Sequence, residues 1–147
     1  MPNDLKFNVI YRVPVYLMFE TLTNPAEITK FTQVPAKFEK EGEFNIYDGY
    51  ITGTNVEIIE NKKIVQKWKF NNWKEPSELI WTFKEVNGNE CQINVHFKNV
   101  PERDSFNNII DLKEIETGFR NSIFKKISDW LGYPQNKDKD DSSDEDD

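Results

Sequence analysis

Residues 41–73 read EGEFNIYDGYITGTNVEIIENKKIVQKWKFNNW, and this stretch decides the fold. It predicts three consecutive antiparallel strands, because β-branched and aromatic runs alternate with turn sequences at Asp48-Gly49 and at 60–63. Two tryptophans close it: Trp68 lies near the end of a predicted strand and Trp73 lies in the loop that follows. The stretch holds no obvious catalytic group, so any enzyme chemistry has to be sought elsewhere in the chain.

The composition describes one domain with an aromatic core. The chain has 147 residues, which suits one domain, and 14% of them are aromatic, so a few large rings carry much of the burial. No apolar run is long enough to span a bilayer, and the first residues lack the pattern of a secretory signal. The single cysteine, Cys91, cannot form an internal disulfide. We therefore expect a reducing compartment, most simply the cytosol.

Most of the negative charge is concentrated at the C-terminus. The net charge is −7, and residues 137–147 contribute seven acids and two lysines, which leaves −2 for the remainder. A chain without a basic excess is not expected to bind nucleic acid. We expect a single folded domain over 1–135 and a disordered acidic tail over 136–147. Ser142 and Ser143 each precede an acid by three positions, which resembles a casein kinase II acceptor pattern, although a solubilising tail is the simpler interpretation.

The periodicity of apolar residues places the elements. A strand is predicted at 6–13, and short helices are expected to start at Pro14 and at Asn24-Pro25. Further strands are predicted at 36–40, 43–48, 50–59, 63–70, 77–86 and 90–98, and a long amphipathic helix at 111–132. The apolar stripe of that helix comprises Leu112, Ile115, Phe119, Ile123, Ile127 and Trp130, widened by Phe124 and Leu131.

This order of elements predicts an α+β helix-grip fold. A curved antiparallel sheet must cover its apolar face, and only the long C-terminal helix is able to cover it. The sheet is expected to wrap around that helix, with the two short helices after the first strand closing one end. The large rings of sheet and helix either fill the core or line a ligand cavity, and their bulk favours a filled core. These rings are Phe38, Phe44, Trp68, Phe70, Trp81, Phe83, Phe97, Phe119 and Trp130.

The residues favour a binding module over an enzyme. Cys91 and His96 are the only residues of their types, but an odd separation in one strand places them on opposite faces. They are better read as a core cysteine and a surface histidine, and together they cannot supply a zinc site. The chain has no Gly-rich phosphate loop and no G-x-S-x-G turn. We expect no catalytic residues, no metal and no cofactor.

The polar face of the later strands is the candidate docking surface. Lys67, Lys69, Lys84 and Lys98, with His96, fall on the parity opposite the apolar residues of their strands. For each lysine alone an ordinary solvated face is the simpler explanation, but as a group they suit docking of a negatively charged protein. Trp73 is either an exposed interface anchor or a lid over the core, and the sequence leaves both open.

Four segments carry a specific resemblance. NPAEITKFT at 24–32, EGEFNIYDG at 41–49, KIVQKWKFNNW at 63–73 and GY at 132–133 resemble the C-terminal-domain family of the activator of heat shock protein 90 ATPase. That family lies in the START-like, or birch-pollen-allergen-like, superfamily. The resemblance covers about Asn8 to Tyr133, and the W-K-F-x-x-W segment is its most specific element.

The resemblance implies a cytosolic co-chaperone, expected to be monomeric, that binds the heat shock protein 90 chaperone and stimulates its ATPase. In that family the domain favours the hydrolysis-competent state of the chaperone, which holds the ATP site. Only a few residues precede the first strand, so we expect weaker stimulation than from a two-domain activator. The alternative is a binding protein for a small hydrophobic ligand in the sheet–helix cavity, and a cyclase- or hydrolase-type enzyme is a third reading.

Overall fold

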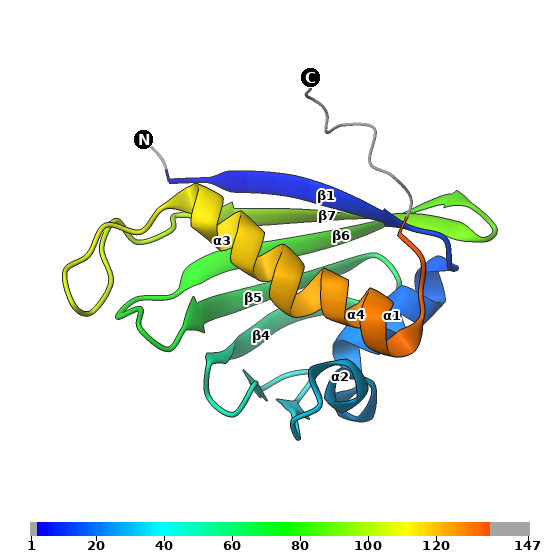
Figure 1. The fold of residues 1–147 in the computed structure, drawn as a ribbon, viewed down its shortest axis with the longest axis horizontal. Coiled ribbons are helices and arrows are strands. Elements are labelled where there is room, and N and C mark those ends of the chain that lie inside the picture. Colours follow the sequence, from blue (N-terminus) through cyan, green and yellow to red (C-terminus); the bar gives the residue numbers. More distant parts are fainter. Residues whose placement is uncertain (1–2, 136–147) are drawn as a thin grey trace.

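The computed structural model describes residues 3–135, which form one seven-stranded antiparallel sheet and a set of helices on one side of it (Figure 1). The strands lie in the order β1-β7-β6-β5-β4-β3-β2. Their bounds are β1 Leu5–Tyr11, β2 Lys37–Phe38, β3 Glu43–Ile46, β4 Ile51–Ile59, β5 Lys63–Phe70, β6 Ser77–Asn87 and β7 Glu90–Lys98. The predicted tail at 136–147, with Ser142 and Ser143, lies outside the described residues.

The C-terminal helix crosses the concave face of the sheet. It consists of α3 (Leu112–Phe119), the π-helical segment η1 (Arg120–Phe124) and α4 (Lys125–Leu131), which follow one another without a break. The short helices α1 (Val15–Thr23) and α2 (Pro25–Thr32) lie beside its C-terminal end (Figure 1). The predicted helix-grip fold is confirmed. None of the helices in the described part of the chain is long and apolar enough to cross a membrane.

Capping residues read from the sequence set the helix boundaries. The Oδ1 atoms of Asn24 and Asp111 accept hydrogen bonds from the backbone N–H groups two residues on, at 2.9 Å each. Gly132 ends α4 with a φ of 74°, a left-handed conformation that glycine adopts without steric cost. The loop between β6 and β7 is also close to prediction: the strands end at Asn87 and resume at Glu90.

The core between sheet and helix is filled by aromatic rings. Phe119, 1% exposed, sits at the centre of this cluster. Five rings surround it with centroid distances between 5.2 and 5.7 Å: Phe7, Trp68, Trp81, Phe97 and Phe124. Such edge-to-face and tilted contacts add stability beyond the burial of area. The rings of both layers therefore occupy the space in which a ligand cavity was the alternative.

The prediction that Trp130 belongs to the apolar stripe is wrong, because its side chain is 55% exposed. The predicted stripe otherwise persists after the π-helical segment η1, since Ile127 in α4 is fully buried. Leu131 packs against the core in place of Trp130. Two tyrosine hydroxyls satisfy carbonyls in this segment: Tyr11 donates to Phe124 O at 2.6 Å and Tyr47 to Ser122 O at 2.5 Å.

A buried polar network lies next to the point where β3 stops pairing with β4. Trp81 Nε1 donates to Gln66 Oε1 at 2.9 Å, and Gln66 Nε2 donates to Asn55 Oδ1 at 2.9 Å. Asn55 Nδ2 in turn donates to the carbonyl oxygen of Glu39 at 2.6 Å. Each of these buried groups thus has a partner, as burial requires. Directly after Asn55 the register of β4 against β5 shifts by one residue, which is a β-bulge.

Candidate partner-binding surface

The outer face of the sheet, on the side away from the helices, presents side chains in rows across β5, β6, β7 and β1. One row comprises Lys67, Glu78 and Lys98, which lie directly opposite one another on neighbouring strands. The next row towards the β6–β7 hairpin places Ile80 opposite His96, which lies opposite Lys6. Residues directly opposite in antiparallel strands share a face, so these side chains form one continuous surface.

Three of the four predicted lysines lie close together. Lys67 is exposed, Lys98 is half-buried, and Lys69 lies two positions beyond Lys67 on the same face. Lys84 does not belong to this group: it lies six positions further along β6 than Glu78, roughly 20 Å away at the rise of a strand. Among the described residues, none of these four lysines takes part in an ion pair. Their charge is therefore available to a partner.

Trp73 is not an exposed anchor. Its side chain is 3% exposed and packs against Trp68 and Phe70, with ring centroids 6.0 and 5.5 Å away. The lid interpretation is therefore the correct one of the two. Its backbone still touches the outer face, because its carbonyl oxygen accepts a hydrogen bond from Lys69 Nζ at 3.2 Å. The burial of Trp73 thus positions Lys69.

The sequence interpretation missed Lys6. This residue lies opposite His96 and lines a shallow hollow of about 380 Å³ on the outer face. Its orientation could have been inferred, because Phe7, Val9 and Tyr11 point inward and alternate residues of β1 must point outward. Next to it, His96 Nε2 lies 3.3 Å from Asp4 Oδ2. A hydrogen bond from the Asn99 N–H, together with His96, holds the pKa of Asp4 below its usual value.

Cys91 and His96 lie on opposite faces of β7, as predicted. Cys91 is fully buried in the core, and burial raises the pKa of its thiol to about 11. A thiol of this kind is protonated at neutral pH and is a poor nucleophile. His96 is half-buried on the outer face. The two side chains therefore do not form a nucleophile–base pair.

Comparison with a family of known proteins supports the resemblance. The family described as "Activator of Hsp90 ATPase homolog 1-like protein" matches residues 12–132. The chain is 34% identical over 73 residues to the activator of 90 kDa heat shock protein ATPase homolog 2 of Mus musculus, a match that covers 48% of this chain and 22% of that protein. It is 25% identical over 120 residues to homolog 1 of Homo sapiens, covering 79% and 33%. The chain thus spans about a third or less of the length of these curated relatives.

Solved structures with a similar fold match a larger part of the chain. A crystal structure of an HSP90 activator from Plasmodium falciparum has a TM-score of 0.83 and 27% identity, and the match covers 90% of this chain and 99% of that chain. The Aha1 dimer from Colwellia psychrerythraea has a TM-score of 0.67 at 12% identity, covering 88% and 97%, and shares the fold. The match with the family model extends over most of the folded body, including the W-K-F-N-N-W segment. The chain therefore belongs to the family of Activator of Hsp90 ATPase homolog 1-like proteins.

Proposed function

We propose that this chain is a co-chaperone that binds the Hsp90 chaperone through the outer sheet face and stimulates its ATPase. The observation that carries the proposal is the likeness to the HSP90 activator from Plasmodium falciparum, which extends over 99% of that chain. The surface is argued from charge: Lys67, Lys69, Lys98 and Lys6 lie on neighbouring strands, with the acids Glu78 and Asp4 among them. An acidic patch on the chaperone would complement it.

The activity requires no chemistry from this chain. A protein that binds the hydrolysis-competent conformation of its partner more tightly than the other conformations raises the population of that conformation. The partner's ATPase rate then rises in proportion to that population until the state is saturated. Charged side chains at the rim of such a contact mainly raise the association rate and select the partner.

The rings around Phe119 favour this function over that of a hydrophobic-ligand carrier. A carrier needs a hollow between sheet and helix, and five aromatic rings pack around Phe119 in that space. We also propose that the chain acts as a monomer, because the outer face carries like charges that repel a second copy.

The test is the steady-state ATPase rate of Hsp90 with and without the full chain, together with titration calorimetry. We expect saturable stimulation and binding that weakens as salt is added, because exposed charges are screened. The double substitution K67E/K69E should weaken binding about tenfold, since each exposed pair contributes up to about 1 kcal/mol. The matched control K113E/K126E makes the same change in charge on the exposed side of the C-terminal helix and should bind like the wild type.

Two results separate the parts of this proposal. If neither binding nor stimulation is observed with nucleotide present, the co-chaperone function is wrong. If stimulation is observed but K67E/K69E and the control behave alike, the function holds and the outer face is the wrong surface.

A further inference from the structure

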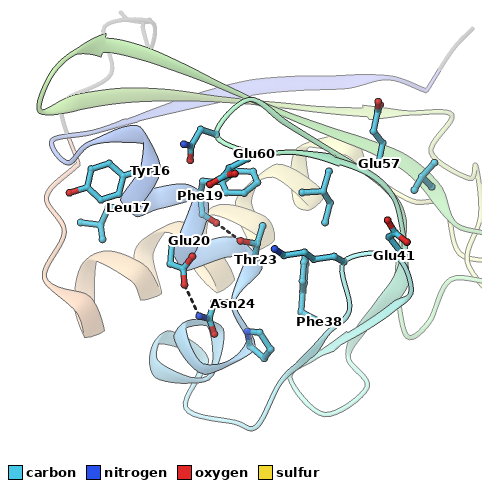
Figure 2. Close-up of a pocket in the computed structure, with 15 residues that line it drawn as sticks. Tyr16, Leu17, Phe19, Glu20, Thr23, Asn24, Phe38, Glu41, Glu57 and Glu60 are labelled. Carbon is cyan, nitrogen blue, oxygen red and sulfur yellow. Dashed lines mark hydrogen bonds between the residues drawn. The ribbon is translucent and has the colours of Figure 1, made fainter.

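A second surface lies at the other side of the molecule, where a groove of about 980 Å³ opens between α1, the β2–β3 hairpin and β4 (Figure 2). Its volume is at the upper end of the roughly 300–1,000 Å³ typical of binding sites. Aromatic and aliphatic side chains line it, among them Phe19, Phe38 and Ile58. Two further lining residues are unusually exposed for apolar side chains: Tyr16 at 61% and Val56 at 57%.

One wall of the groove is an open sheet edge. Strand β3 pairs with β4 only from Ile46↔Ile51 to Glu43↔Thr54, and Asn55 N adds one hydrogen bond to Gly42 O at 2.8 Å. Beyond that point, in the part of the chain that the structure describes, no strand lies beside residues 56–59 on the side away from β5. Alternate N–H and C=O groups of such an edge point outward and can pair with an added strand. Four residues offer roughly 14 Å of edge.

A β-bulge lies at Val56, where this edge lines the groove. Asn55 pairs with Gln66 and Glu57 with Val65, so Val56 is the extra residue without a partner on β5. A bulge bends its strand and re-aims side chains, and it commonly occurs next to functional sites. The buried bonds from Gln66 to Asn55 and from Asn55 to Glu39 fix its position. The exposure of Val56 is thus built into the fold.

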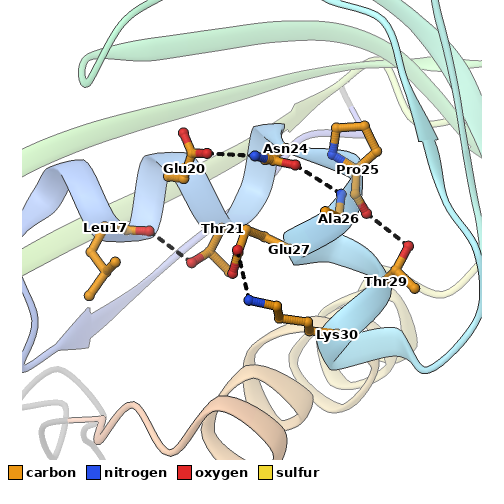
Figure 3. A network of polar contacts seen from close by, with 9 residues as sticks. All are labelled: Leu17, Glu20, Thr21, Asn24, Pro25, Ala26, Glu27, Thr29 and Lys30. Carbon is orange, nitrogen blue, oxygen red and sulfur yellow. Dashed lines mark hydrogen bonds and ion pairs between the residues drawn. The ribbon is translucent and has the colours of Figure 1, made fainter.

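The other wall is equally fixed (Figure 3). At the corner between α1 and α2, Asn24 Oδ1 accepts from Ala26 N at 2.9 Å while its Nδ2 donates to Glu20 Oε2 at 2.6 Å. Lys30 and Glu27 form an ion pair of 3.0 Å on the next turn. Walls that are ordered before binding reduce the entropic cost of taking up a ligand.

The groove is lined mainly by acidic side chains, which favour a positively charged ligand. Four glutamates line it, Glu20, Glu41, Glu57 and Glu60, against one lysine, Lys40. Of these four, Glu57 alone has a cationic partner among the described residues, Lys63 at 3.7 Å. A second copy of this chain that paired through its own β4 edge would bring the same acids to the same place. Self-pairing is therefore repelled, and a positively charged segment is attracted.

We propose that this groove binds an extended, basic peptide segment of a partner protein, which adds to β4 as a further strand. Backbone bonds to residues 56–59 would supply affinity. Alternate side chains would supply selectivity: apolar ones packed towards Tyr16 and Phe19, lysines or arginines at the acidic rim. This site is separate from the outer-face lysines, so it goes beyond the proposed Hsp90 contact and its test needs no chaperone.

The test measures the binding of a fluorescein-labelled octapeptide of alternating lysine and valine to the full chain by fluorescence anisotropy. We expect saturable binding that weakens with added salt. A peptide with glutamate in place of lysine should not bind. Two further lysine–valine peptides are N-methylated, one at its odd-numbered and one at its even-numbered residues. One of the two should lose binding, because its methyl groups replace the N–H groups that face β4, and the other should still bind.

Matched variants locate the site. E41K/E60K reverses two exposed groove acids that form no ion pair with any described residue, and it should weaken binding about tenfold. E85K/E102K makes the same change of charge at exposed positions outside the groove and should bind like the wild type. Tyr16→Ala in α1 should also weaken binding, whereas Phe106→Ala, which removes a ring that is 76% exposed in the loop between β7 and α3, should not. Circular dichroism confirms that each variant is folded.

Three outcomes would overturn the proposal. The first is no binding of the basic peptide up to millimolar concentration. The second is binding that E41K/E60K and E85K/E102K weaken equally, which would indicate attraction to the whole acidic chain. The third is a dimer in sedimentation that the groove variants dissociate, which would make a second copy of the chain the occupant.

Discussion

Phe119 is the residue on which the core depends most. It is 1% exposed and its ring touches rings from both layers, so its removal leaves a cavity that rigid neighbours cannot fill. Phe119→Ala should lower the free energy of unfolding by about 3–5 kcal/mol. Urea melts followed by circular dichroism measure this. Phe106→Ala is the control and should change stability by less than about 0.5 kcal/mol, because its side chain is 76% exposed. A loss below about 1 kcal/mol for Phe119→Ala would contradict the central position of the ring.

At this scale the sequence predicts side-chain direction well and burial less well. The parity of β7 placed Cys91 inside and His96 outside, because a strand alternates strictly. The sequence leaves the burial of Trp73 open and predicts the burial of Trp130 wrongly. Trp73 lies in a loop, where no period applies, and its burial follows from contacts with Trp68 and Phe70. Trp130 and Leu131 are neighbouring apolar residues that both fit the spacing of the helix, and spacing alone does not tell which of the two packs against the core.

Strand β4 has no space for a side chain at Gly53. A Cβ atom there would lie 1.9 Å from the Lys67 carbonyl oxygen and 2.6 Å from Phe44 Cζ, so both strands would have to move. Gly53→Ala should cost about 1–3 kcal/mol through overpacking. Gly88→Ala is the matched control in the β6–β7 loop, where no atom lies within 4 Å of the added carbon. Equal melting temperatures for the two variants would show that β4 and β5 can separate locally.

The elements themselves could be predicted because their apolar residues repeat regularly over long segments. Strands β5 and β7 have the predicted bounds, and the C-terminal helix ends at the predicted glycine. The bulge in β4 could not be predicted, since it depends on the buried bond between Asn55 and Gln66, whose partners are eleven residues apart. The groove exists because β3 is short and leaves the end of β4 unpaired beside the bulge, and no local pattern of the sequence predicts this.

Taken as a whole, the molecule has two candidate surfaces with opposite charge. The lysines of the outer face lie on β1, β5 and β7, whereas the glutamates of the groove lie on α1, in the β2–β3 loop, on β4 and in the turn after it. If both proposals hold, Hsp90 and a basic peptide should bind at once. The affinity for the lysine–valine peptide should change less than about twofold when Hsp90 is saturating, because sites that share no element couple weakly. Anisotropy titrations with and without Hsp90 measure this, and competition between the two ligands would mean that they share one surface.

The four tryptophans have an optical consequence. Trp68, Trp73 and Trp81 are almost entirely shielded from solvent, whereas Trp130 is 55% exposed on α4. Emission from the first three should lie at short wavelengths in the native state, and iodide should quench the fourth selectively. Trp130→Phe would leave a spectrum that reports on the core alone, and unfolding would shift it to the red. Because the exposed indole lies on α4 and lines neither candidate surface, binding at either surface should leave its quenching by iodide unchanged, and a loss of quenching would place the partner on the helix instead.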